Sequence, residues 1–138
     1  MSRIKDHLPA APLRGLALIA CYDLVDDPAT GRRDVIGIFG VITSASFPAA
    51  IEKFYGWCSV AGSGAQDAFV DLADERGNLI AEGGFRVSNW GITGVCEAGI
   101  ALRDVTFARP GVYRLRLFTA QGVLLERNLV AREGKLGA

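Results

Sequence analysis

The chain contains a single histidine, His7, which limits the catalytic chemistry that its side chains can carry out. Serine and cysteine nucleophiles need an adjacent general base, most often a histidine. His7 lies among charged residues and prolines near the N-terminus, where we expect a solvated side chain. We therefore predict no catalytic residues and no enzymatic activity. An enzyme with a site formed by the loop 89–94 and the acidic loop at 23–34 is kept as an alternative.

Carboxylates gather around the first predicted loop, between residues 23 and 34. The group consists of Asp23, Asp26, Asp27 and Asp34. A calcium site needs several convergent oxygens, but this spacing is not that of an EF-hand loop. Arg32 and Arg33 also follow directly and neutralise part of the charge. We predict an ordinary solvated hairpin loop, with no metal and no cofactor.

A second acidic group is formed by Asp71, Asp74 and Glu75. Paired carboxylates are the usual devices of acid–base and glycosidic chemistry. Here, however, Asp71 alternates with apolar neighbours along a strand, so we expect it on the wet face. The other two fall in a predicted turn. We therefore interpret all three as solvated side chains.

The cysteines Cys21, Cys58 and Cys96 show no metal-binding spacing. Free cysteine packs as a small apolar residue, so we expect three reduced thiols in the core. A bridge from Cys96 to Cys21 or to Cys58 remains the alternative, and it would imply an oxidising compartment.

The overall composition favours a single globular domain without a nucleic-acid partner. The chain has 138 residues, half of them apolar, and a formal net charge of zero. Nucleic-acid binding usually requires a basic excess, whereas a neutral chain lacks the repulsion that keeps copies apart. No segment reaches the length of a membrane span. We expect a cytoplasmic protein with no membrane partner.

The positions of these residues depend on strands, as the stretch "FARPGVYRLRLF" illustrates. Pro110 and Gly111 form a predicted turn, after which apolar and charged residues alternate. Side chains of a strand alternate between its faces, so one face is core and the other is wet. The short reversal at 120–122 then leads into a last strand, which completes a predicted hairpin.

The same pattern, a short turn followed by an apolar run, recurs along the chain and predicts about eight strands. The predicted runs are 16–24, 34–44, 53–61, 67–74, 79–88, 95–102, 112–118 and 123–132, with one short helical turn at 49–52. We predict an all-β protein, namely an antiparallel two-sheet β-sandwich of the immunoglobulin-like type. The predicted organisation is a flexible N-terminal arm (1–14), the sandwich (15–133) and a C-terminal tail (134–138).

Four segments together resemble a family of small uncharacterised bacterial proteins that is defined as a domain of unknown function. They read "LALIACYDL", "VIGIFGVITSASFP", "FVDLADERGNLI" and "FARPGVYRLRLFTAQGVLLE", and they cover nearly the whole chain after residue 14. The resemblance implies one β-sandwich domain without an assigned activity. It transfers no functional residues to this chain.

Large aromatic and cationic side chains give the strongest indication of a binding surface, because exposed aromatic patches mark protein interfaces. The candidate interaction residues are Tyr55, Trp57, Trp90, Arg114, Arg116 and Phe118. The alternatives are a solvated arginine face paired with Glu126, and aromatic rings that are covered within the fold, by the N-terminal arm for example.

The sequence favours a non-enzymatic interaction module that binds protein, first of all another copy of itself. One alternative is a carrier of a small apolar ligand, held in space that Ala17, Gly37, Gly56 and Gly99 would leave between the sheets. The other is a structural component of a phage or another assembly, by fold-level analogy.

Overall fold

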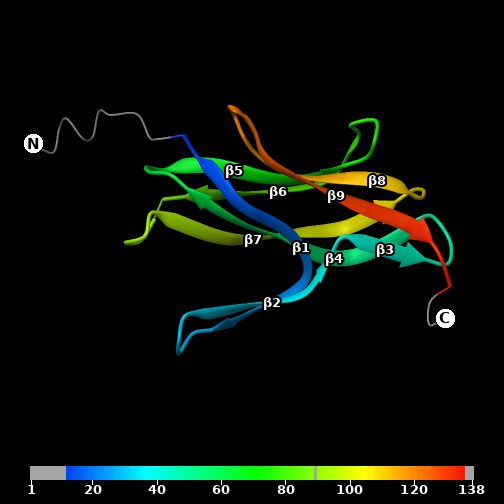
Figure 1. The fold of residues 1–138 in the computed structure, drawn as a ribbon, viewed down its shortest axis with the longest axis horizontal. Helices are drawn as coiled ribbons and strands as arrows, with labels where there is room; N and C mark the ends of the chain where they lie inside the picture. Colours follow the sequence, from blue (N-terminus) through cyan, green and yellow to red (C-terminus); the bar gives the residue numbers. More distant parts are fainter. Residues whose placement is uncertain (1–11, 89, 136–138) are drawn as a thin grey trace, which may run out of the picture.

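The computed structural model describes residues 12–88 and 90–135, which form strands and no helix (Figure 1). The nine strands are β1 (Arg14–Asp27), β2 (Arg32–Phe39), β3 (Val41–Ser44), β4 (Ala49–Ala61), β5 (Gln66–Ala73), β6 (Leu79–Val87), β7 (Val95–Phe107), β8 (Gly111–Thr119) and β9 (Gly122–Glu133). The all-β prediction is therefore confirmed, with nine strands in place of about eight. His7, most of the predicted arm and residues 136–138 of the predicted tail lie outside the described residues.

The strands form two sheets, as predicted. The four-stranded sheet has the order β2-β1-β4-β7, and the five-stranded sheet, curled into a half-barrel, has the order β3-β9-β8-β5-β6. Every neighbouring pair is antiparallel except β3 and β9, which run parallel from Val41 beside Val130 to Ser44 beside Glu133. The prediction of purely antiparallel sheets is wrong at this pair.

The additional strand arises because the chain changes sheets within one apolar run. The run 34–44 was expected to be one strand, but β2 pairs with β1 whereas β3 pairs with β9 in the other sheet. Only Gly40 separates them, and its carbonyl accepts a hydrogen bond from the Val130 N–H. The predicted helical turn at 49–52 is also wrong, since these residues begin β4 and pair with β7.

The core lies between the inner faces of the two sheets. Phe54 and Leu102 of the four-stranded sheet and Leu72 and Leu115 of the five-stranded sheet are fully buried. The sheets pack tightly at small residues, because a Cβ added to Gly56 would lie 2.8 Å from Val70 Cγ1. This close packing follows from the alternation of apolar residues along each strand.

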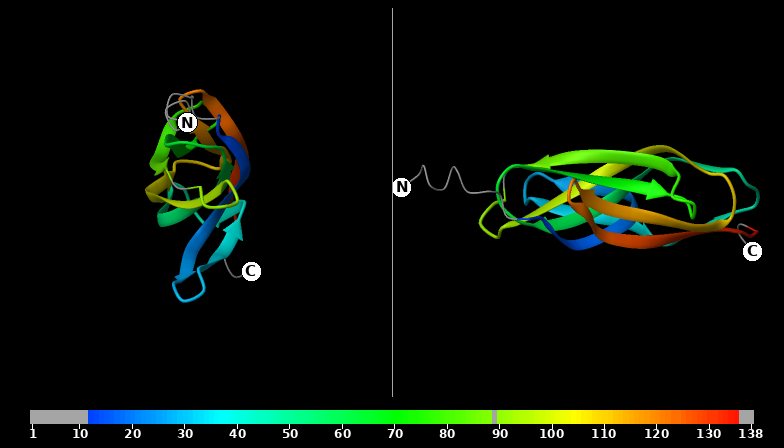
Figure 2. Two further views of the ribbon diagram at one scale, coloured as in Figure 1. Left: turned by 90° about the vertical axis from the view of Figure 1, so that its left-hand side faces the viewer. Right: turned by 90° about the horizontal axis from the view of Figure 1, so that it is seen from above.

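The hairpin formed by the second half of β1 and by β2 projects obliquely from the body of the protein (Figures 1 and 2). Its base stays attached through the ring of Phe39, which stacks on Tyr22 at 4.4 Å and meets the core Phe54 edge-on at 5.3 Å. Farther along, Leu24 occupies the space beside Gly99 on the outer face of the four-stranded sheet. One face of the hairpin is thus turned toward that sheet and the other toward solvent.

A tyrosine fixes the turn between β7 and β8, in the stretch "FARPGVYRLRLF". The buried Tyr113 hydroxyl donates a hydrogen bond to the carbonyl oxygen of Arg109 at 2.6 Å, and its ring packs edge-on against Phe107. The hydroxyl therefore ties the end of one sheet to the first residues of the other sheet. The predicted turn at Pro110 and Gly111 is present, with Gly111 at a φ of 157°.

Tyr113→Phe should lower the free energy of unfolding by about 1–2 kcal/mol, because the hydrogen bond between the buried Tyr113 and the Arg109 carbonyl is lost. Tyr22→Phe is the matched control: Tyr22 is 48% exposed, and its replacement should change stability by less than about 0.5 kcal/mol. Urea denaturation measures both variants. Equal stability of the two variants would contradict this role of Tyr113.

Candidate interaction surfaces

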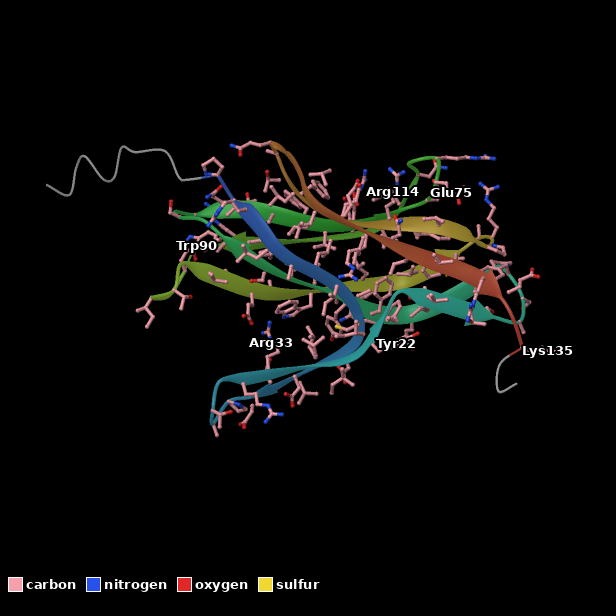
Figure 3. The ribbon with its side chains drawn as sticks, in the orientation of Figure 1. Tyr22, Arg33, Glu75, Trp90, Arg114 and Lys135 are labelled. Carbon is pink, nitrogen blue, oxygen red and sulfur yellow. The ribbon has the colours of Figure 1, made fainter. Side chains whose placement is uncertain are left out.

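Three of the six predicted interaction residues lie together on the outer face of the five-stranded sheet. Arg114, Arg116 and Phe118 alternate along β8 with the buried Tyr113, Leu115 and Leu117, as the sequence predicted. Arg114 is exposed and lies near Glu75 at the upper edge of the view in Figure 3. Arg116 and Phe118 are half-buried, because side chains of β5 cover them.

Asp71 on β5 is the main partner of Arg116. Its two carboxylate oxygens accept hydrogen bonds from Arg116 Nε and Nη2, both at 2.7 Å. The hydrogen bond with Asp71 raises the pKa of Arg116. Glu126 is the cross-strand neighbour of Arg116, as expected, but the bidentate pair forms with Asp71.

The prediction that Asp71 is solvated is wrong, since it is only 4% exposed although it lies on an outer face. Burying a carboxylate is costly unless it is paired and hydrogen-bonded. The planar guanidinium of Arg116 meets this requirement with two parallel hydrogen bonds, and it covers the carboxylate at the same time.

An aromatic pair adjoins this ion pair on the same face. The rings of Phe69 and Phe118 stack with their centroids 5.4 Å apart, and Phe69 lies over Gly84 of β6. A groove of about 430 Å³ opens beside them and is lined by Phe69, Glu82, Gly83, Gly84 and Phe118. In the predicted run 67–74, Phe69 stands on the same period-two face as Asp67 and Asp71, which was the signal for its exposure.

Tyr55 and Trp57 lie on the outer face of the other sheet and are both half-buried. The hairpin covers part of this face, because Leu24 lies over Gly99 with the Tyr55 ring next to it. The indole N–H of Trp57 is buried and has no hydrogen-bond acceptor among the described residues. The alternative that these rings are covered within the fold holds in part, because both are half-buried and the hairpin lies next to the Tyr55 ring.

Trp90 lies at one end of the body, in the loop between β6 and β7 (Figure 3). Its indole N–H donates a hydrogen bond to the Gly64 carbonyl at 2.8 Å, and its ring approaches Gly62 closely. These contacts connect two loops, so Trp90 has a clear structural role. It lies apart from the other five predicted interaction residues.

A group of exposed apolar side chains that was not among the predicted interaction residues lies on the hairpin. Val25, Ile36 and Ile38 are 45%, 46% and 63% exposed and fall on the solvent side of the hairpin by its register. The signal was available in "DVIGIF", where apolar side chains point to both faces of one strand.

The carboxylates of the acidic loop already have partners of their own. Asp26 pairs with Arg33 at 2.7 Å, which lowers the pKa of Asp26, and Asp34 pairs with Arg32 at 2.7 Å. Asp27 accepts hydrogen bonds from the Ala29 N–H and the Thr30 hydroxyl, so it caps the turn. No group of three possible ligands capable of holding a metal ion forms within 12–88 and 90–135.

The three cysteines are free thiols, as the favoured prediction had it. Cys21 and Cys58 are buried and Cys96 is half-buried. Burial raises the pKa of Cys58 to about 12, so this thiol stays protonated at neutral pH.

No family model and no curated protein matches the chain. Similar solved structures include a β-glucosidase from Chaetomella raphigera, with 10% identity and a TM-score of 0.44, and a β-glucuronidase from Bifidobacterium dentium in complex with coumarin-3-O-glucuronide, with 14% identity and a TM-score of 0.39. Each match covers 87% of this chain but only 18% of the enzyme. The described part of this chain contains no helical segment long and apolar enough to cross a membrane.

Asp71→Asn should lower the free energy of unfolding by about 1–3 kcal/mol, because it removes the buried charge that pairs with the half-buried Arg116 through two hydrogen bonds. Asp67→Asn is the matched control, since the Arg86–Asp67 pair is exposed and should contribute less than about 0.5 kcal/mol. Thermal and urea unfolding measure both variants. A larger loss for the control would contradict this difference.

Proposed function

We propose that the protein is a non-enzymatic interaction module that binds a second copy of itself through the solvent side of the β1–β2 hairpin. The supporting observation is the exposure of Val25, Ile36 and Ile38 on an element that projects from the body. Single exposed apolar residues are normal on a protein surface, but adjacent ones on a projecting element indicate an interface.

The charges around this surface favour a second copy as the partner. The chain has zero net charge, so two copies do not repel each other. Within residues 12–88 and 90–135, Asp23 and Asp27 of the hairpin form no ion pair. The same holds there for Lys53 and Arg103, which are cross-strand neighbours on the adjoining four-stranded sheet.

A two-fold axis makes each surface contact its own counterpart. The apolar residues of two hairpins would then pack against each other at the centre. The hairpin carboxylates Asp23 and Asp27 of one copy would approach Lys53 and Arg103 of the other, which gives each charge an opposite partner.

The same proposal takes the sandwich as immunoglobulin-like. Two features support it: β1, β4 and β7 are neighbours in one sheet, and β5, β8 and β9 are neighbours in the other. The Tyr113 hydroxyl donates a hydrogen bond to the backbone carbonyl four residues upstream, which matches the tyrosine corner of such domains. Domains of this type often serve as binding modules, which is a fold-level analogy.

The alternatives have less support. A carrier of an apolar ligand needs space between the sheets, but the Val70 side chain approaches Gly56 closely there. Gly37 is exposed on the hairpin and Gly99 lies on the outer face, so neither leaves room between the sheets. An assembly component of a phage or another structure would use the same self-association, so it is a special case of the proposal. The free thiols are compatible with a reducing compartment, and the cytoplasm remains the proposed location.

The test is the oligomeric state by size-exclusion chromatography with light scattering. Wild type should be a dimer, and Ile36→Thr/Ile38→Thr should raise the dissociation constant by about tenfold or more, since each 1.4 kcal/mol of lost apolar burial is a factor of ten. Threonine keeps the β-branched shape that strands favour, so the hairpin should persist.

Leu79→Thr/Val123→Thr is the matched control, because these side chains are 52% and 51% exposed at other places on the surface. The control should dimerise as the wild type does. A wild type that stays monomeric at high concentration, or equal dimerisation of both variants, would rule out self-association through the hairpin.

A further inference from the structure

A row of four charged residues crosses the outer face of the five-stranded sheet. The register places Glu126, Arg116, Asp71 and Glu82 side by side on β9, β8, β5 and β6. Three carboxylates thus share one guanidinium. Arg116 donates two hydrogen bonds to Asp71, whereas the Glu82 carboxylate forms no hydrogen bond or ion pair among the described residues.

The uncompensated charge lies between β5 and β6. Asp71 and Glu82 are direct cross-strand partners, and like charges in that position destabilise a sheet. The burial of Asp71 strengthens the repulsion, because charges interact more strongly away from water. Arg114 does not relieve it, since it lies in the next row beside Ala73, on the far side from the aromatic pair.

An aromatic wall adjoins Glu82 on the other side. Phe118 and Phe69 are cross-strand partners, and Gly84 is the partner of Phe69 on β6. Because Gly84 has no side chain, the Phe69 ring lies directly against the backbone of β6. The resulting groove of about 430 Å³ combines two aromatic rings with a single free carboxylate.

We propose that this groove binds an organic cation, namely a guanidinium or alkylammonium group on a short aliphatic stem. Glu82 accepts hydrogen bonds from the cationic head, and the rings of Phe69 and Phe118 contact the stem and the face of the head. A metal ion would need several convergent oxygens, whereas this groove offers one free carboxylate and an apolar wall. An anion would be repelled by the excess of carboxylates around the groove.

The same chemistry is found in the arginine or lysine side chain of a partner protein and in a free small amine. The site lies on a different sheet from the hairpin surface and does not depend on self-association. A failure of either proposal therefore leaves the other one standing.

The test is an NMR titration of backbone amides with ethylguanidinium, with ethylurea as its neutral isostere. Ethylguanidinium should cause saturable shifts confined to the residues around the groove, and ethylurea should cause none. Glu82→Gln should weaken binding by about twofold to fivefold, the factor that corresponds to an exposed cation–π and charge contact. Phe118→Leu should weaken it to a similar extent.

The matched control is Glu52→Gln, an exposed carboxylate on β4 of the other sheet, which should bind as the wild type does. A glycine–arginine–glycine peptide distinguishes the sources: tighter binding than ethylguanidinium indicates a partner's side chain, and equal or weaker binding indicates a free small cation. The proposal is overturned if ethylguanidinium gives no saturable shifts, if ethylurea binds equally well, or if Glu82→Gln has no effect while its amide spectrum remains that of a folded protein.

Discussion

The structure depends on the burial of two apolar sheet faces against each other. This interaction has no direction of its own, so the geometry is set by where large side chains find small partners. Val70 packs on Gly56 at the centre, Ile100 on Gly83 where β6 and β7 meet, and Leu125 on Gly15 where β1 and β9 meet. These contacts close both open sides of the sandwich. Large side chains of the inner faces thus fill the space beside these glycines.

The outer faces of the two sheets differ in how far the rest of the chain covers them. The four-stranded sheet is partly covered by its own hairpin, which shields Tyr55 and leaves apolar side chains of β2 exposed instead. In the described part of the chain, no hairpin covers the five-stranded sheet in this way. There Arg116 lies over Asp71 and two phenylalanines stack beside it, so a buried carboxylate persists on a face that is turned to solvent. Side chains therefore stay open to solvent on both sides of the protein: apolar residues of β2 on one side, and the Phe69–Phe118 pair on the other.

Local patterns in the sequence predicted those parts of the fold that local geometry determines. The alternation of Tyr113, Leu115 and Leu117 with Arg114 and Arg116 fixes the two faces of β8, and Gly77, at a φ of 82°, forms the turn expected between β5 and β6. Long-range pairing could not be read in the same way. The division between β2 and β3 depends on strands nearly 90 residues away, and nothing in the run "VIGIFGVITS" marks a change of sheet.

The candidate sites illustrate the same limit. The outward-facing positions of Arg114, Arg116 and Phe118 followed from period-two alternation. The burial of Asp71, by contrast, requires Arg116, which lies 45 residues farther along the chain. Trp57 and Trp90 were expected at a binding surface because large aromatic rings often mark one. Whether a ring meets solvent or its own fold depends on the path of the hairpin and the loops, which composition does not encode.

The central claim is that two copies meet at the projecting hairpin. The most direct test is hydrogen exchange, measured by mass spectrometry on dilute and on concentrated protein. The account predicts that concentration slows exchange within Arg32–Phe39 and the second half of β1, while β5, β6 and β8 exchange at unchanged rates. Identical exchange at both concentrations, or slowing confined to the five-stranded sheet, would contradict it.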